Sequence, residues 1–164
     1  PQIGEHYKPF WINDEDFSDN GFEPFCMQMK DGGKTVEKCG YQDSKGKILI
    51  NPTFARTYIF SEGLAGVCQK IEKLCGYIKK KGELVIKANY QLVGNFSEGL
   101  GIVTIGAADA SDYDKNGYIN KKGEFVIKPQ YSDSEPFKNG IAKVRIRNLS
   151  FCINKKDKEV KCVD

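Results

Sequence analysis

Three stretches of this chain repeat one pattern of glycine, aromatic and aliphatic residues, and this repetition is the strongest constraint on its fold. Each copy begins with Gly-Tyr, passes through a Lys-Gly pair and ends in Phe-x-x-Gly followed by Leu or Ile. The leading glycines, Gly40, Gly76 and Gly117, lie 36 and 41 residues apart, a spacing typical of stacked repeat architectures. Because one unit is too small to bury its own apolar face, we expect a core only where neighbouring units touch.

Within each copy the apolar residues alternate with polar ones at a period of two. The segments 83–87 and 124–128 are rich in β-branched, aliphatic and aromatic residues flanked by Glu and Lys, which is the pattern of a half-buried strand. Gly82 and Gly123 lie where a short hairpin loop needs a positive φ. The glycine of each Phe-x-x-Gly element, at Gly63, Gly99 and Gly140, marks a tight bend. The sequence therefore predicts an all-β array of short antiparallel hairpins, about three strands per unit, with no amphipathic helix.

The two ends of the chain depart from the pattern, as the terminal units of a repeat array do. Phe17-Ser18-Asp19-Asn20-Gly21 resembles a degenerate Phe-x-x-Gly element, and Asp157 replaces the hairpin glycine in a last, shortened copy. We expect one domain, divided into an N-terminal cap with a degenerate repeat (1–39), repeats at 40–75, 76–116 and 117–149, and a truncated C-terminal repeat (150–164).

Charge and hydropathy exclude two classes of partner. The formal net charge is only +3, with 25 basic and 22 acidic residues mixed along the chain, so no basic surface for nucleic acid is indicated. No apolar run approaches the roughly 18 residues of a membrane-spanning helix. We expect neither nucleic-acid binding nor a membrane span.

The six cysteines occupy related places in the repeat. Cys39 and Cys75 directly precede Gly-Tyr, Cys68 follows Val67, and Cys26 lies at the comparable place upstream of the first copy. This alignment predicts the disulfides Cys26–Cys39 and Cys68–Cys75, and by elimination Cys152–Cys162. Six cysteines permit fifteen connectivities, and diagonal pairings between units stay open.

Zinc binding is the competing explanation for these cysteines, but the chain has no Cys-x-x-Cys pair and its lone histidine, His6, is distant from them in sequence. Disulfides imply an oxidising compartment. The chain begins at Pro1, as expected if a secretion signal precedes it in the precursor. We therefore expect a periplasmic, secreted or cell-surface protein.

The repeated residues resemble those of the bacterial WG repeat family, also called the KWG repeat. The best match is Gly117-Tyr118-Ile119-Asn120-Lys121-Lys122-Gly123 followed by Val126-Ile127-Lys128-Pro129-Gln130-Tyr131, and the resemblance extends over about residues 40 to 145. The family tryptophan is replaced by Cys39, Cys75 and Asn116. The resemblance implies a β-repeat fold and a binding or structural role, because the family shares no catalytic residues.

Catalytic and metal sites find little support in the sequence. His6 is the only histidine and no Gly-x-Ser-x-Gly motif occurs. Glu62 and Glu98 form a recurrent carboxylate pair, but their equivalent positions favour a role in turns over an acid and base. Asp112-x-Asp114-x-Asn116-Gly117 resembles half of a calcium loop, yet its twelfth position would be Gly123, which cannot supply the required ligand. We expect no catalytic residue, no metal and no cofactor.

The lysines at the hairpin tips are a candidate interaction surface with two explanations. They occur at 79–81, 121–122 and 155–156, where they would form one edge of the stack if successive units superpose. Such an edge could attract an anionic surface, a glycan or an acidic protein. The more common role of lysines at strand edges is to prevent pairing with other molecules.

The loop from Thr104 to Asn116 is the strongest candidate for partner binding, because variable loops on a rigid repeat commonly carry function. It is longer than the equivalent Cys68 to Cys75 connection. The candidate binding residues are Asp109, Asp112, Tyr113, Asp114, Lys115 and Asn116. The aromatic and acidic N-terminal cap is a second candidate.

These observations predict a non-catalytic, extracytoplasmic protein that binds another protein. The favoured role is a periplasmic inhibitor or immunity protein for a toxin or lytic enzyme, in which the acidic loop enters a basic cleft. A surface adhesin that binds a host receptor is the alternative within the same class. A hydrolase that uses the recurrent carboxylates is the alternative from a different class.

Overall fold

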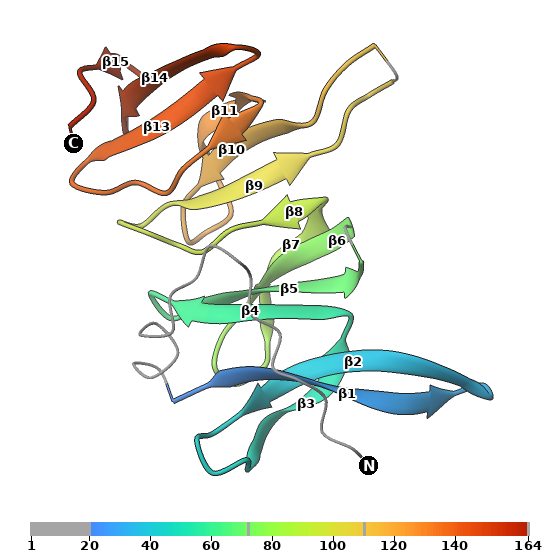
Figure 1. Ribbon diagram of the computed structural model, residues 1–164. Coiled ribbons are helices and arrows are strands. Elements are labelled where there is room, and N and C mark those ends of the chain that lie inside the picture. The colour runs from blue at the N-terminus through green and yellow to red at the C-terminus, as the bar shows by residue number, and fades with distance from the viewer. Residues whose placement is uncertain (1–20, 72, 110, 164) are drawn as a thin grey trace.

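The computed structural model describes residues 21–71, 73–109 and 111–163, which form four small antiparallel sheets stacked along one axis (Figure 1). The described residues contain no helix, and hence none long and apolar enough to cross a membrane. The predicted all-β array is confirmed.

Strands follow one another in chain order within each sheet. Sheet 1 contains β1 (Glu23–Asp31), β2 (Lys34–Gln42) and β3 (Ile48–Phe54); sheet 2 contains β4 (Arg56–Ser61), β5 (Leu64–Lys70), β6 (Lys73–Ile78) and β7 (Leu84–Tyr90). Sheet 3 contains β8 (Leu92–Val93), β9 (Gly101–Ile105), β10 (Lys115–Ile119) and β11 (Phe125–Tyr131); sheet 4 contains β12 (Asp133–Ser134), β13 (Ile141–Ile146), β14 (Leu149–Asn154) and β15 (Glu159–Val160).

The sheets are out of phase with the sequence copies. A copy that starts at Gly76 supplies the last two strands of sheet 2 and then the first two strands of sheet 3. Each internal sheet is therefore completed by hydrogen bonds between two successive copies, which joins neighbours through the backbone as well as through side chains.

Sheets 2, 3 and 4 each also contain a first strand that the sequence pattern does not mark. Ser61 pairs with Leu64 across a two-residue turn in which Glu62 and Gly63 both have positive φ, so the predicted bend closes a hairpin. The strand before this turn is six residues long in β4 but only two in β8 and β12. Two residues are too few to show an alternating pattern.

The core lies between sheets, and because each copy spans two sheets, each interface is formed largely within one copy with added residues from its neighbours, rather than only where neighbouring copies touch. Buried apolar residues form three clusters, one at each interface between successive sheets. Tyr77 of sheet 2 packs against Phe96 of sheet 3 with 4.8 Å between ring centroids. Its hydroxyl donates to the Gly94 carbonyl at 2.6 Å. The tyrosine of one copy thus contacts the Phe-x-x-Gly phenylalanine of the next sheet, which explains why both recur.

The same aromatic contact recurs at the other two interfaces. Tyr41 packs on Phe60 and Tyr118 packs on Phe137, with centroids 4.9 Å and 4.8 Å apart. In the last copy the tyrosine position is taken by Cys152, which forms a disulfide with Cys162.

Three disulfides connect the pairs expected from the repeat. Cys26 is joined to Cys39, Cys68 to Cys75 and Cys152 to Cys162, and no described cysteine is free. In sheet 3 the equivalent cross-strand pair is Thr104 and Asn116, where the Thr104 hydroxyl donates to Asn116 Oδ1 at 2.7 Å. A hydrogen bond here takes the place of the disulfide.

Sheet 4 differs from the preceding sheets in having charged, exposed side chains on its outer face. Gly66 of sheet 2 lies so close to sheet 3 that a Cβ atom there would come within 2.7 Å of Val93. The equivalent residue of sheet 4 is Lys143, which is exposed, as is Arg145 two residues later. A polar outer face of this kind is typical of a terminal unit, because no further sheet covers it.

Candidate functional site

The predicted partner-binding loop between β9 and β10 is held by its own carboxylates. Asp114 accepts hydrogen bonds from the Ala107 N–H at 2.9 Å and from Gln91 Nε2 at 3.1 Å. Asp109 accepts from the Ser111 N–H at 2.8 Å. These bonds fix the shape of the loop, although Asp109 and Asp114 are both exposed.

The remaining predicted residues of this loop also have partners, either within it or on the adjacent strands β9 and β11. Lys115 lies 3.0 Å from the Asp112 carboxylate and 5.5 Å from the centre of the Tyr113 ring. The Tyr113 hydroxyl donates to the Gln130 carbonyl at 3.2 Å. Asn116 faces Thr104, as described above. The loop thus presents a built surface with acidic groups at its tip.

Hydrogen bonds to the carboxylates lower the pKa of two of these acids. The Ser111 hydroxyl and N–H hold the pKa of Asp109 below its usual range, and the Lys115 ammonium does the same for Asp112. Both groups are therefore charged at neutral pH. Within the described part of the loop, no three acidic groups come close enough together to hold a metal ion.

Only one group of described residues brings three ligand atoms together, namely Cys26, Glu37 and Cys39. The two sulfurs are bonded to each other in a disulfide, so they are not thiolates that could bind a metal. This cluster therefore does not fit a metal site.

The connections β1–β2, β5–β6, β9–β10 and β13–β14 all lie on one side of the stack, toward the right of Figure 1. We call this side the connection face; its described residues are 27–38, 69–71, 73–74, 105–109, 111–115 and 146–149. The long β1–β2 hairpin and the β9–β10 loop project from it, with the short β5–β6 turn between them.

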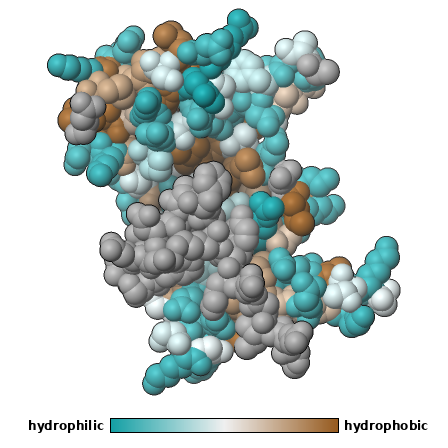
Figure 2. Space-filling model, in the orientation of Figure 1, coloured by the Kyte–Doolittle hydropathy of each residue, from teal (hydrophilic) through white to brown (hydrophobic). Residues whose placement is uncertain are grey.

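Exposed apolar side chains gather on the connection face. They are Met29, Ile71, Leu74, Ile105 and Leu149, at least one from each sheet, and Ile71 and Leu149 are 62% and 66% exposed. Figure 2 shows apolar surface at the β5–β6 turn.

Leu74 has a φ of 55°, a left-handed conformation that is unfavourable for a leucine. The turn nevertheless keeps an apolar residue at this exposed position.

A second group of exposed apolar residues follows the outer strands β3, β7 and β11. Its members are Ile48, Leu49, Leu84, Val85, Phe125 and Val126. This group has a clear structural part: the Tyr90 ring of β7 packs edge-on against Phe125 of β11, so the strands of successive sheets support one another.

The opposite side of the stack carries a ladder of Glu and Lys residues, which we call the ladder side. Glu62 accepts from the Gly99 N–H of the next sheet at 2.8 Å, and Glu98 accepts from the Gly140 N–H at 2.9 Å. Lys121 and Lys155 donate to the carbonyls of Glu62 and Glu98, both at 2.9 Å.

Because Glu62 and Glu98 make these bonds, the recurrent carboxylates serve the contact between successive turns. The Gly140 N–H, with a smaller effect from Lys155, lowers the pKa of Glu98. A general acid at neutral pH needs the opposite shift. His6 and the rest of the aromatic and acidic cap up to Asn20 lie outside the described residues.

Sequence reasoning did not identify Ile71, Leu74 and Leu149 as surface candidates. The available indication was an apolar residue within or beside a turn of polar residues, as in Lys70-Ile71 and Lys73-Leu74. This pattern is weak because single exposed apolar residues are common. Only the stacking of the sheets places them on one face.

Comparison with known proteins identifies the repeat. A family model described as WG containing repeat matches residues 40–70, 76–107 and 117–149, which together make up more than half of the chain. No curated protein and no solved structure matches this chain. Each of the three matches begins at the glycine of a Gly-Tyr pair that the sequence pattern singles out, and the chain therefore belongs to the WG repeat family.

Proposed function

We propose that this protein is a non-catalytic binding module that acts outside the cytoplasm and recognises another protein through its connection face. The observation that carries the proposal is the row of exposed apolar side chains on that face, Ile71 and Leu74 above all. Exposed apolar side chains that gather on one face among polar residues can mark an interaction site. The three disulfides are consistent with an oxidising compartment.

The charges around the apolar row favour a partner with a basic cleft. In sheet 3, the β9–β10 loop exposes Asp109 and Asp114, and hydrogen bonds to these carboxylates fix the shape of the loop. A preorganised loop loses little conformational entropy when it binds, and its acidic tip would complement a basic groove. Enzymes that act on anionic polymers have such grooves, so an inhibitor or immunity protein for a toxin or lytic enzyme is the role best supported.

A lack of catalysis is part of the proposal. The two recurrent carboxylates are engaged by backbone N–H groups of the next turn, and the low pKa of Glu98 suits a charged acceptor. A water or substrate that bound to either carboxylate in place of these N–H groups would loosen the contact between sheets.

The test is capture of a partner from the bacterial envelope fraction, followed by an assay of the captured enzyme with and without the protein. Ile71→Ser and Leu74→Asn remove the apolar surface, and asparagine tolerates the left-handed backbone of position 74. Val163→Ser, which changes an exposed apolar residue away from this face, is the matched control. We expect the first two variants to lose capture and inhibition by at least about tenfold, and the control to retain both.

Neutral variants of the acidic loop separate charge from loop shape. Asp109→Asn and Asp114→Asn keep an acceptor oxygen for the loop bonds but remove the charge, and we expect slower association and a weaker dependence on salt. Retention of wild-type capture by Ile71→Ser and Leu74→Asn would refute the connection face as the binding surface. Capture only from host extracts, with no inhibited enzyme, would instead support the adhesin role.

A further inference from the structure

The hairpins between the last two strands of each sheet share a side-chain cap, with one exception. In sheet 1, Asp43 Oδ1 accepts hydrogen bonds from the N–H groups of Lys45 and Lys47 at 2.9 Å and 2.8 Å. Asn120 caps the sheet 3 hairpin in the same way, through the N–H groups of Lys122 and Glu124 at 2.9 Å and 3.0 Å. Asn154 repeats the arrangement in sheet 4 at 2.9 Å and 3.1 Å.

In sheet 2 the capping residue is Lys79, whose side chain has no acceptor atom. The backbone of this hairpin nevertheless has the same form: the Lys79 N–H donates to the Glu83 carbonyl at 3.0 Å and the Gly82 N–H to the Lys79 carbonyl at 2.8 Å. The N–H groups of Lys81 and Glu83 therefore occupy the places of the capped donors, but no carboxyl or amide oxygen of position 79 can reach them.

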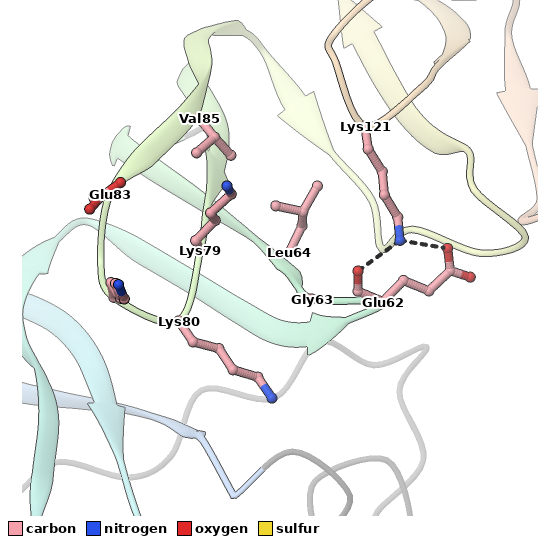
Figure 3. A pocket seen from close by; sticks show the side chains of 9 residues that line it. Glu62, Gly63, Leu64, Lys79, Lys80, Glu83, Val85 and Lys121 are labelled. Carbon is pink, nitrogen blue, oxygen red and sulfur yellow. Dashed lines mark hydrogen bonds and ion pairs between the residues drawn. The ribbon is translucent and has the colours of Figure 1, made fainter.

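This hairpin borders an open pocket of about 740 Å³ on the ladder side (Figure 3). Its lining residues are Glu62, Gly63, Leu64, Lys79, Lys80, Lys81, Glu83, Val85 and Lys121. Figure 3 shows Lys121 bonded to Glu62, whereas the lysines of the hairpin make no such bond to the residues drawn. Lys80 lies 5.6 Å from the Phe22 ring centre, and no ion pair within the described chain involves Lys79 or Lys81.

We propose that the β6–β7 hairpin binds a carboxylate of another molecule, an Asp or Glu side chain of an acidic peptide segment, which takes the place of the missing cap oxygen. The Asp43 carboxylate in sheet 1 shows that this backbone geometry accepts such an oxygen. In sheet 2 the acceptor comes from outside, and the lysines of the hairpin supply the positive charge that favours it.

The lining of the pocket selects for a peptide carboxylate over a dense polyanion. Leu64 and Val85 offer apolar contact to the methylene groups of an Asp or Glu side chain, while the carboxylates of Glu62 and Glu83 repel a closely spaced series of negative charges. The site lies on the side opposite the connection face, so it goes beyond the proposed function and does not depend on it.

The experiment is an amide chemical-shift titration of the isotope-labelled protein with a capped Gly-Glu-Gly peptide, using capped Gly-Gln-Gly as the neutral control. We expect saturable shifts of the Lys81 and Glu83 amide signals, with a dissociation constant on the order of millimolar for a single carboxylate. The signals of Lys122 and Glu124, whose hairpin carries its own cap, should stay unchanged. Inorganic phosphate, added in a separate titration without peptide, should shift the Lys81 and Glu83 amide signals only weakly.

Two variants of one residue isolate the cap from the charge. Lys79→Asn introduces the capping residue of the sheet 3 and sheet 4 hairpins, so its side chain should occupy the site and weaken peptide binding at least tenfold. Lys79→Gln removes the same charge but is too long for this cap, so it should weaken binding only a few-fold. Equal binding by Lys79→Asn and wild type, shifts with Gly-Gln-Gly, or equally strong binding of phosphate would each overturn the proposal.

Discussion

At the scale of single residues, the glycine of each Gly-Tyr pair is set by close approach of the neighbouring strand. A Cβ atom at Gly117 would lie 2.7 Å from the Ile127 carbonyl oxygen, closer than real Cβ contacts. At Gly94 the nearest atom would be 3.5 Å away, which is ordinary contact. We expect Gly117→Ala to lower the free energy of unfolding by about 1 to 3 kcal/mol, as measured by urea denaturation. Gly94→Ala, the control, should be neutral or slightly stabilising; equal effects would contradict this explanation.

Several of these residue roles could be predicted from the sequence because the copies align. Cys39 and Cys75 occupy one position of the repeat, so their partners could be inferred from position as well. The role of Glu62 and Glu98 in turns follows from the same argument. The hydrogen bond from Gln91 to Asp114 could not be predicted, because it joins the β9–β10 loop to the link between β7 and β8, and their distance apart depends on how sheets 2 and 3 stack.

At the scale of strands and sheets, the bonds that cross between neighbours give the stack its cohesion. The buried Tyr118 hydroxyl donates to the Glu135 carbonyl of the next sheet at 2.7 Å. We expect Tyr118→Phe to cost about 1 kcal/mol of stability, because the lost bond also leaves a carbonyl without its partner. Tyr113→Phe, which removes a longer bond from the half-buried loop, should cost less. Urea denaturation of both variants checks the order, and a larger loss for Tyr113→Phe would argue against cohesion through Tyr118.

Sequence reasoning recovered the hairpins but not every strand. The segments β7 and β11 are each seven residues long and alternate visibly, whereas β8 and β12 owe their existence to pairing with β9 and β13. The connection face escaped prediction for a related reason: its apolar residues come from different sheets, and no pattern along the chain shows that they share a side.

At the scale of the whole molecule, the buried tyrosines make stability sensitive to alkaline pH. Burial raises the pKa of Tyr41, Tyr77 and Tyr118 well above the ordinary value. Below about pH 10 these groups are neutral in both the folded and unfolded states, so they do not change stability with pH. Above about pH 10 only the unfolded chain ionises them, and the free energy of unfolding should fall by up to about 1.4 kcal/mol per tyrosine per pH unit.

Denaturation midpoints measured between about pH 8 and about pH 11 test this dependence. The Tyr118→Phe variant is the control, because it should lose stability less steeply in this range by the contribution of one tyrosine. Tyrosinate absorbance from all three groups in the folded protein at about pH 10 would disprove the argument, since it would show that burial does not hold them neutral.

The offset between sequence copies and sheets makes the length of this molecule adjustable in evolution. Because each internal sheet is half one copy and half the next, excision or duplication of one whole copy leaves two half-sheets that match and close into a complete sheet. Copy number can then change in a single genetic event without leaving an incomplete two-stranded sheet, while Lys143 and Arg145 keep the outer face of sheet 4 polar. Relatives with more or fewer units would present a longer or shorter row of connections, and hence a different span of surface to a partner.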